Sequence, residues 1–417
     1  MATSTETIPE TGAGSGNEQY KQKFGSLPGL IIIVAIGFAL YFGMKAIGGM
    51  HAILSYEEIL GHIKNGTATG HLYWFFMNFT EPDFYGGLVS AIFILVGGFV
   101  AWLLAVKKTK WAGFEICYGQ AKIWPWVFAS QILSLVLTLY AFQFITMFHT
   151  LELSWVPTFI VLVSVPPSMV LMYGPGVKTL VTASVIGAAI CTPAAYWINQ
   201  AITTLAPMHT KMPIAVANVL AMAITGIIAA SVCHVLPWMK KTEIPMINNT
   251  NAPKEKPYSA KWLMRRTITD LSEPLFYGSD IASGFLIVGV ILEWILNNDH
   301  STGGAAAIPA ILLSQIISGA VGVFLYTNKY IERGWYATYV PVVCIAPACV
   351  LLFGDTIPVI LFSSILGAII GAPLAEEITD RLPKFIHPTV ANVTSMGVGT
   401  IMVVAVMQCM PWFTITI

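Results

Sequence analysis

The heptapeptide TEPDFYG at residues 80–86 recurs as SEPLFYG at residues 272–278, and each copy directly precedes a long apolar segment. Four further matches follow in the same order in the two halves of the chain. They are SQILS at 130–134 with SQIIS at 314–318, residues 167–174 with 347–354, residues 187–193 with 367–373, and VANV at 216–219 with VANV at 390–393. Because the matched letters include Glu, Gln, Asn and Pro, a shared apolar composition does not account for them. The sequence therefore predicts two copies of one structural unit.

The composition is that of a membrane protein. Of 417 residues, 56% are hydrophobic and only 10% are charged, whereas about 25% are charged in an ordinary soluble domain. Twenty-one basic residues balance 21 acidic ones, so no basic field exists to attract nucleic acid. The six cysteines are scattered without the spacing of a metal site or a disulfide framework, and we interpret them as small buried apolar residues. Soluble enzymes and nucleic-acid-binding proteins are thus excluded as classes.

Eleven apolar segments are each long enough to cross the roughly 30 Å hydrocarbon core as a helix. The fold class is therefore an all-α polytopic membrane protein with about eleven transmembrane helices. The prolines at positions 166, 167, 341 and 347 predict kinks or breaks in two of them. The segments are Leu27–Ile47 and residues 86–106, 125–149, 154–173, 177–200, 213–238, 280–297, 306–326, 335–353, 357–375 and 388–412.

The repeat divides these segments into one peripheral helix and two units of five helices. We expect a disordered cytoplasmic tail at 1–26, the peripheral transmembrane helix at 27–48, the first repeat at 79–239, a basic cytoplasmic linker at 240–271 and the second repeat at 272–417. Five is an odd number, so the second copy must cross the membrane in the opposite sense to the first. Inverted repeats of this kind are typical of secondary transporters.

The basic residues indicate the orientation of the chain. With the N-terminus in the cytoplasm, every Lys and Arg lies on the inner side except Lys45, Lys64 and Lys211. This distribution is what the positive-inside rule requires. The sequence therefore predicts an integral protein of the bacterial inner membrane, with its N-terminus inside and its C-terminus outside.

Polar residues at matched positions in matched helices are candidates for a substrate site. Gln131 and Gln315 each lie six residues after a proline and between two serines on one helical face. They are interpreted either as substrate contacts or as helix–helix hydrogen bonds, which contribute about 0.6 kcal/mol on average. Asn218 and Asn392 lie near the start of their helices. We expect these four side chains to converge on one cavity near the middle of the membrane.

The second copy of the asparagine segment is the more polar one, and it adds Thr394 and Ser395 to the candidate substrate-binding residues. Residues 387–399 are rich in small side chains. This pattern is typical of a broken or re-entrant helix that lines a cavity, and equally of a close helix interface.

Four acidic residues are candidates for ion coupling. Glu81 and Glu273 belong to the repeated turn, where they either complement a helix N-terminus or bind a proton or sodium ion. Glu293 lies late in an apolar segment, where an ionised carboxylate is costly. Glu377 lies in a charged cluster that only the second copy has. A solvated helix end is the simpler interpretation of that cluster.

The sequence predicts a proton- or sodium-coupled secondary transporter of a small polar organic solute that works by alternating access. No arginine lies inside an apolar segment, so a neutral or zwitterionic solute, or a weak acid, fits better than a multiply charged anion. We expect no catalytic residue, no metal site and no cofactor except a transported sodium ion. The partners are the solute and the lipid bilayer, and a homodimer is left open.

Three other classes remain as alternatives at this stage. They are the membrane component of a phosphotransferase-type sugar permease, a channel, and a non-transporting subunit of a larger complex. ATP-driven transport within this chain is excluded because no phosphate-binding loop motif occurs.

Overall fold

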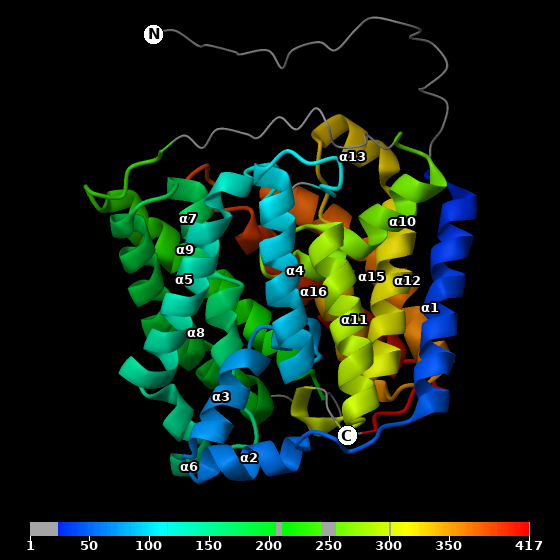
Figure 1. Ribbon diagram of the computed structural model, residues 1–417, viewed down its shortest axis with the longest axis horizontal. Helices are drawn as coiled ribbons and strands as arrows, with labels where there is room; N and C mark the ends of the chain where they lie inside the picture. Colours follow the sequence, from blue (N-terminus) through cyan, green and yellow to red (C-terminus); the bar gives the residue numbers. More distant parts are fainter. Residues whose placement is uncertain (1–23, 115, 206–210, 243–255, 300–301, 417) are drawn as a thin grey trace, which may run out of the picture.

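A computed structural model describes residues 24–114, 116–205, 211–242, 256–299 and 302–416. All regular elements within these ranges are helical, and most helices run roughly parallel to one axis of the molecule (Figure 1). Eight helices in the described ranges are long and apolar enough to cross a membrane, which makes this chain an α-helical polytopic membrane protein. These are α1 (Leu27–Ile47), α4 (Leu88–Val106), α5 (Trp124–Val136) extended by the π-helical η4 (Leu137–Ala141), α8 (Val177–Leu205), α9 (Ile214–Val235), α12 (Ile308–Leu325), α15 (Ile357–Thr379) and α16 (Thr389–Gln408).

The other three predicted spans are shorter or broken. Helix α11 (Asp280–Leu296) has 17 residues. At 154–173 the chain forms the 3-10 helix η6 (Thr158–Leu162) and then α7 (Val165–Tyr173), and at 335–353 it forms the π-helix η9 (Pro341–Ile345) and then α14 (Ala346–Phe353). The kink or break predicted from proline is confirmed at 154–173, where the helix is interrupted between Leu162 and Val165. At 335–353 the chain stays helical through Pro341 and Pro347, and the distortion is the π-helical stretch itself.

One predicted span ends earlier than expected. The helix in the segment predicted at 125–149 stops at Ala141, and Gln143 has a left-handed backbone with a φ of 56°. It then forms the 3-10 helix η5 (Phe144–Thr146) and the one-turn helix α6 (Met147–Thr150). Apolar composition continues through this turn, which is why the sequence did not indicate the end.

Four short helices were not predicted. Helices α2 (Tyr56–Lys64) and α3 (Ala68–Met77) lie at one end of the bundle, and α10 (Ala260–Thr269) and α13 (Thr327–Arg333) lie toward the other (Figure 1). Helix α10 falls within the expected basic linker 240–271, of which residues 243–255 lie outside the described residues. The expected disordered tail, residues 1–26, also lies outside them except for residues 24–26.

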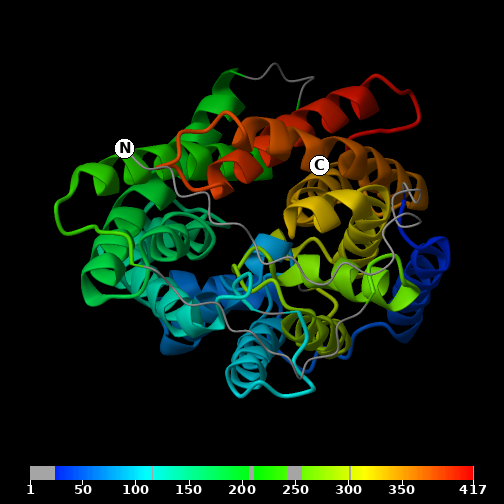
Figure 2. The same cartoon turned by 90° about the horizontal axis from the view of Figure 1, so that it is seen from above.

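Helices at equivalent sequence positions have equivalent neighbours. Helix α4 packs against α11 at one edge of the bundle, and α9 packs against α16 at the opposite edge (Figure 2). Between these pairs, α5, α7 and α8 pack together, as do α12, α14 and α15. Helix α1 packs on the outside, against α12 and α10. The two halves thus share one pattern of helix packing.

The α4–α11 pair is in very close contact at small residues. A Cβ atom added to Gly289 would lie 2.6 Å from the Cβ of Phe93 and 2.9 Å from the Cα of Ser90. On the same helix, a Cβ on Gly284 would have no atom within 4 Å. These two glycines therefore form a matched pair, of which only Gly289 is needed for the helix crossing.

We expect Gly289→Ala to destabilise the protein, because overpacking costs about 1–3 kcal/mol. Gly284→Ala should be neutral or slightly stabilising, since alanine is favoured over glycine in a helix by roughly 0.5–1 kcal/mol. Thermal unfolding in detergent, followed by reaction of a thiol-specific dye with the five buried cysteines, measures both effects. Equal melting temperatures for the two variants would show that the α4–α11 contact is not as close as described.

Candidate functional site

The two copies of the repeated heptapeptide fold into the same turn. In the first, the backbone N–H of Gly87 donates to Thr80 Oγ1 at 3.0 Å, and in the second, that of Ser279 donates to Ser272 Oγ at 2.9 Å. Phe84 and Phe276 both have left-handed backbones, with φ of 65° and 63°. This conformation is uncommon for a non-glycine residue. Its occurrence at both positions shows that the sequence repeat is also a repeat of local structure.

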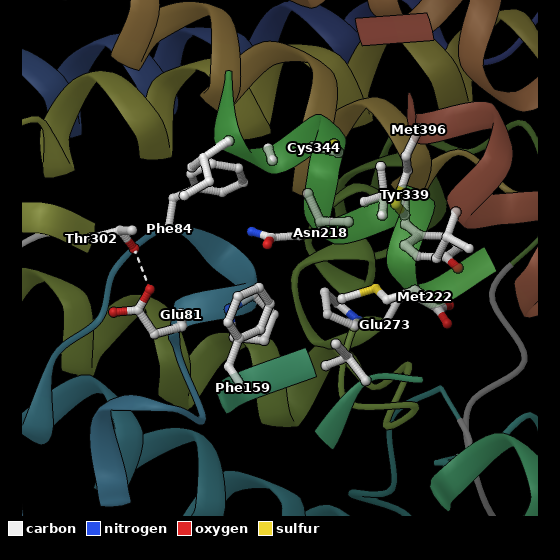
Figure 3. A pocket seen from close by; sticks show the side chains of 18 of the residues that line it. Glu81, Phe84, Phe159, Asn218, Met222, Glu273, Thr302, Tyr339, Cys344 and Met396 are labelled. Carbon is white, nitrogen blue, oxygen red and sulfur yellow. Dashed lines mark hydrogen bonds between the residues drawn. The ribbon is translucent and has the colours of Figure 1, made fainter. Parts of the chain in front are cut away.

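Both turns line one cavity in the interior of the protein (Figure 3). The space between its lining side chains is about 740 Å³, including the part that opens outward. Most lining residues form sequence-equivalent pairs. These pairs are Glu81 with Glu273, Pro82 with Pro274, Phe84 with Phe276, Phe159 with Tyr339, Val163 with Val343, Ala215 with Thr389, Val219 with Val393, and Met222 with Met396.

The broken segments supply part of this lining. Phe159 lies in η6, Val343 lies in η9, and Tyr339 directly precedes η9. Interrupted helices are tolerated at membrane depth where they line a cavity rather than face lipid. The proline-rich segments thus form a wall of the cavity. The sequence analysis named no candidate site residue within these two segments.

Glu81 is almost completely buried, with 3% of its surface exposed. Its Oε2 atom accepts a hydrogen bond from Thr302 Oγ1 at 3.0 Å (Figure 3). The same atom accepts a second one from Trp155 Nε1 at 3.1 Å. Its Oε1 atom has no hydrogen-bond partner among the described residues. Burial raises the pKa of Glu81, and the two hydrogen bonds offset part of that rise. This carboxyl group is therefore suited to binding a proton or another cation.

Glu273 has a different electrostatic environment. Its Oε1 atom accepts from Trp335 Nε1 at 3.1 Å, as Glu81 does from Trp155, but it also forms an ion pair with Arg266 at 2.8 Å. Arg266 is itself buried and pairs with Asp270 at 2.9 Å. Within the described ranges, which omit residues 300 and 301, no ion pair involves Glu81. The two equivalent carboxylates thus differ in their charge compensation.

Asn218 is the candidate substrate residue that lines the cavity directly. It is 5% exposed and lies on α9, with its amide between Phe84 and Phe159 (Figure 3). Its Oδ1 atom has no hydrogen-bond partner in the described part of the chain. Asn392 lies behind this lining, where it interacts with the hydroxyl group of Tyr339.

The remaining candidates on α16 bond to the backbone. Thr394 Oγ1 donates to the carbonyl of Val390 at 2.6 Å, and Ser395 Oγ donates to that of Gly371 at 2.7 Å. Helix α16 is continuous from Thr389 to Gln408, so the interpretation of this region as a broken helix is wrong. The small residues allow close packing instead, since a Cβ on Gly399 would lie 2.7 Å from a side-chain carbon of Ile345.

Each glutamine binds the turn of the other repeat, and neither lines the cavity. Gln131 Nε2 donates to the carbonyls of Leu162 at 2.9 Å and Leu275 at 3.1 Å, and its Oε1 accepts from the hydroxyl of Tyr277 at 3.3 Å. Reciprocally, Gln315 Nε2 donates to the carbonyl of Asp83 at 3.1 Å, and its Oε1 accepts from the hydroxyl of Tyr85. We expected both glutamines to meet the asparagines at one cavity, but neither does. Each glutamine instead holds the turn of the other repeat in position.

Two of the acidic candidates lie away from the cavity. Glu293 is buried in α11, and its Oε2 accepts from the backbone N–H of Ser90 at 2.9 Å, in the first turn of α4. Glu377 is more than half exposed and pairs with Arg381, which lies just beyond the end of α15. Only Glu81 and Glu273 of the four line the cavity.

The sequence analysis missed the aromatic partners of the two carboxylates. Trp155 and Trp335 lie at the spacing that also relates residues 167–174 to 347–354, so the repeat could have revealed them. Arg266 and Thr302 have no counterparts in the repeat and carried no signal. Comparison of the chain with protein-family models and with curated proteins finds no match.

We expect Gln315→Met to destabilise the protein by roughly 1–3 kcal/mol, because it leaves the buried hydroxyl of Tyr85 and carbonyl of Asp83 without their partner. Ser318→Ala, one turn along the same helix, should change stability little, since the hydroxyl of Ser318 is buried with no hydrogen-bond partner among the described residues. Chemical or thermal unfolding in detergent measures both. A Gln315→Met protein as stable as Ser318→Ala would contradict the positioning role.

Proposed function

We propose that this protein is an ion-coupled secondary transporter of a small polar organic solute, working by alternating access between two inverted five-helix repeats. The observation that carries the proposal is the cavity lined by sequence-equivalent residues from both halves. A solute bound there contacts both halves at once. Relative movement of the halves then changes the side of the membrane to which the site opens.

Two further features support the inverted arrangement. Each repeat has five predicted spans, and equivalent helices have equivalent neighbours. The reciprocal bonds of Gln131 and Gln315 to the opposite turns are what a two-fold relation between the halves requires. If the halves are related by such an axis, exchanging their conformations converts an outward-open protein into an inward-open one of similar energy.

Glu81 is the proposed coupling residue. Its carboxyl group is buried beside the cavity, and its raised pKa lets it bind a proton at higher pH than an ordinary carboxylate. The groups facing it are Trp155, Thr302 and the ring of Tyr56, with Asp83 in the same turn. Sodium is the alternative coupling ion, since a carboxylate also ligates sodium.

We expect Glu81→Gln to remove the acceleration of solute uptake that an imposed proton or sodium gradient gives, while gradient-independent exchange of solute continues. The physical reason is that an amide has the size of the carboxyl group but cannot take up a proton. The assay is uptake into proteoliposomes of a solute chosen by a thermal-shift screen of metabolites, with and without sodium. Glu377→Gln is the control and should retain full gradient-driven accumulation, because Glu377 is exposed and distant from the cavity lining.

The same assay separates the alternatives. Retention of gradient-driven accumulation by Glu81→Gln would exclude Glu81 as the coupling site. Uptake that requires soluble phosphodonors would favour a sugar permease, and flux without saturation would favour a channel. Absence of flux for every solute that binds would favour a non-transporting subunit.

The proposed location is the bacterial inner membrane, with the N-terminus in the cytoplasm. Helices α10 and α13, at one end of the bundle, carry five basic residues in the described sequence: Lys261, Arg265, Arg266, Lys329 and Arg333. At the other end, helices α2 and α3 together carry one lysine, Lys64, and no arginine. This asymmetry supports the assignment of the end with α10 and α13 to the cytoplasmic side.

We expect Glu57→Cys on α2 to react with a membrane-impermeant maleimide added to intact cells, and Glu332→Cys on α13 to react only after the cells are opened. Both glutamates are exposed, so a difference in reactivity reports the side of the membrane. A Cys409→Ser background removes the exposed native thiol. The reverse labelling pattern would invert the proposed orientation.

A further inference from the structure

We propose that the cavity binds an organic ammonium ion with an apolar body, whose N–H groups lie between Glu81 and Asn218. This inference deepens the proposed function by naming the substrate class, and it rests on that function only for the statement that the ion is transported. Binding itself can be tested separately.

The first argument is the supply of hydrogen-bond acceptors. Glu81 Oε1 and Asn218 Oδ1 both belong to side chains that are at least 95% buried, and neither has a hydrogen-bond partner in the described ranges. Buried polar atoms without partners are costly. A ligand that brings N–H donors would satisfy both atoms, whereas a ligand that brings only acceptors would satisfy neither.

The second argument is charge. No Lys, Arg or His is among the described residues that line the cavity, while two carboxylates are. Arg266, which lies behind Glu273, compensates that carboxylate at 2.8 Å. Glu81 has no such cation in the described part of the chain. An ammonium ion would supply the missing positive charge, and its charge-assisted hydrogen bonds would be about twice as strong as neutral ones.

The third argument is the apolar and aromatic lining. Phe84 and Phe159 lie on either side of the Asn218 amide (Figure 3), and Trp155 is bonded to Glu81 itself. Phe276 and Tyr339 continue the aromatic lining toward Glu273. Aromatic faces attract organic cations, and the attraction is stronger when the site is desolvated. The same rings bury the apolar body of the ligand.

This inference revises one expectation from the sequence. The absence of arginine from the apolar segments led us to a neutral or zwitterionic solute or a weak acid. Two carboxylates and unpartnered acceptor atoms line the cavity, and no basic side chain of the described residues does, so the solute that fits best is a cation. The bound cation would also compete with the proton for Glu81, and this competition links the substrate site to the proposed coupling site.

The experiment compares three ligands with one arene and three different polar groups: 2-phenylethylammonium, 2-phenylethanol and 3-phenylpropanoate. Binding to the purified full chain in detergent is measured by titration calorimetry at neutral pH. We expect the ammonium ion to bind at least about tenfold more tightly than the alcohol, and the carboxylate to bind most weakly. This ranking needs no variant, so it tests the proposal even if a substitution impairs folding.

Three variants locate the site. Glu81→Gln should weaken binding of the ammonium ion by about tenfold or more and change that of the alcohol less than about twofold. Phe159→Leu should also weaken binding of the ammonium ion more than binding of the alcohol, because the substitution removes one aromatic face. The control Glu377→Gln should leave all three affinities unchanged.

The outcomes are distinct. Equal affinities for the three ligands, tightest binding of the carboxylate, or no binding of any of them would overturn the inference. So would an unchanged preference for the ammonium ion in a folded Glu81→Gln protein. If the ammonium ion binds selectively but liposomes show no flux of it, the transport proposal fails and the binding inference stands.

Discussion

The reciprocal bonds between each glutamine and the opposite turn connect the two halves of this protein at its centre. Gln131 holds the turn that contains Glu273, and Gln315 holds the turn that contains Glu81. Each turn includes a phenylalanine in a left-handed conformation, which is strained unless its surroundings fix it. The glutamine amides supply such support, because each binds a main-chain carbonyl and a tyrosine hydroxyl at once. The positions of both cavity carboxylates therefore depend on residues that never touch the cavity.

The sequence predicted the helical membrane fold, the equivalent helices and the proline breaks because these features repeat along the chain. Apolar length, proline position and the order of the matched segments are all local properties. The end of η4 at Ala141, which closes the span that begins with α5, was missed because apolar composition continues beyond it. Helix α10 was missed because its charged residues are typical of a solvated linker, although Arg266 turns inward from it.

The site was predicted less well than the fold. Matched polar residues indicated which side chains are buried, but burial has two causes in a membrane protein. Gln131 and Gln315 are buried because they bond to main-chain carbonyls of the opposite turns, whereas Asn218 is buried beside a cavity. A single sequence does not distinguish these cases, since each glutamine bonds to a turn in the other half of the chain. Glu81 and Glu273 were identified because proline and tyrosine repeat around them.

The difference between the two equivalent carboxylates follows from what surrounds each turn. Glu273 faces the buried Arg266, so its negative charge is compensated without a ligand. Glu81 faces a tryptophan and a threonine, whose neutral hydrogen bonds do not compensate a full charge. A buried and uncompensated carboxylate is costly, so Glu81 is neutralised by whatever cation can reach it. The raised pKa of Glu81 favours a proton as that cation. In the proposed site an ammonium ion would displace the proton, because one carboxylate cannot neutralise both. Exchange of one cation for the other at Glu81 would thus couple solute movement to proton movement through a single side chain.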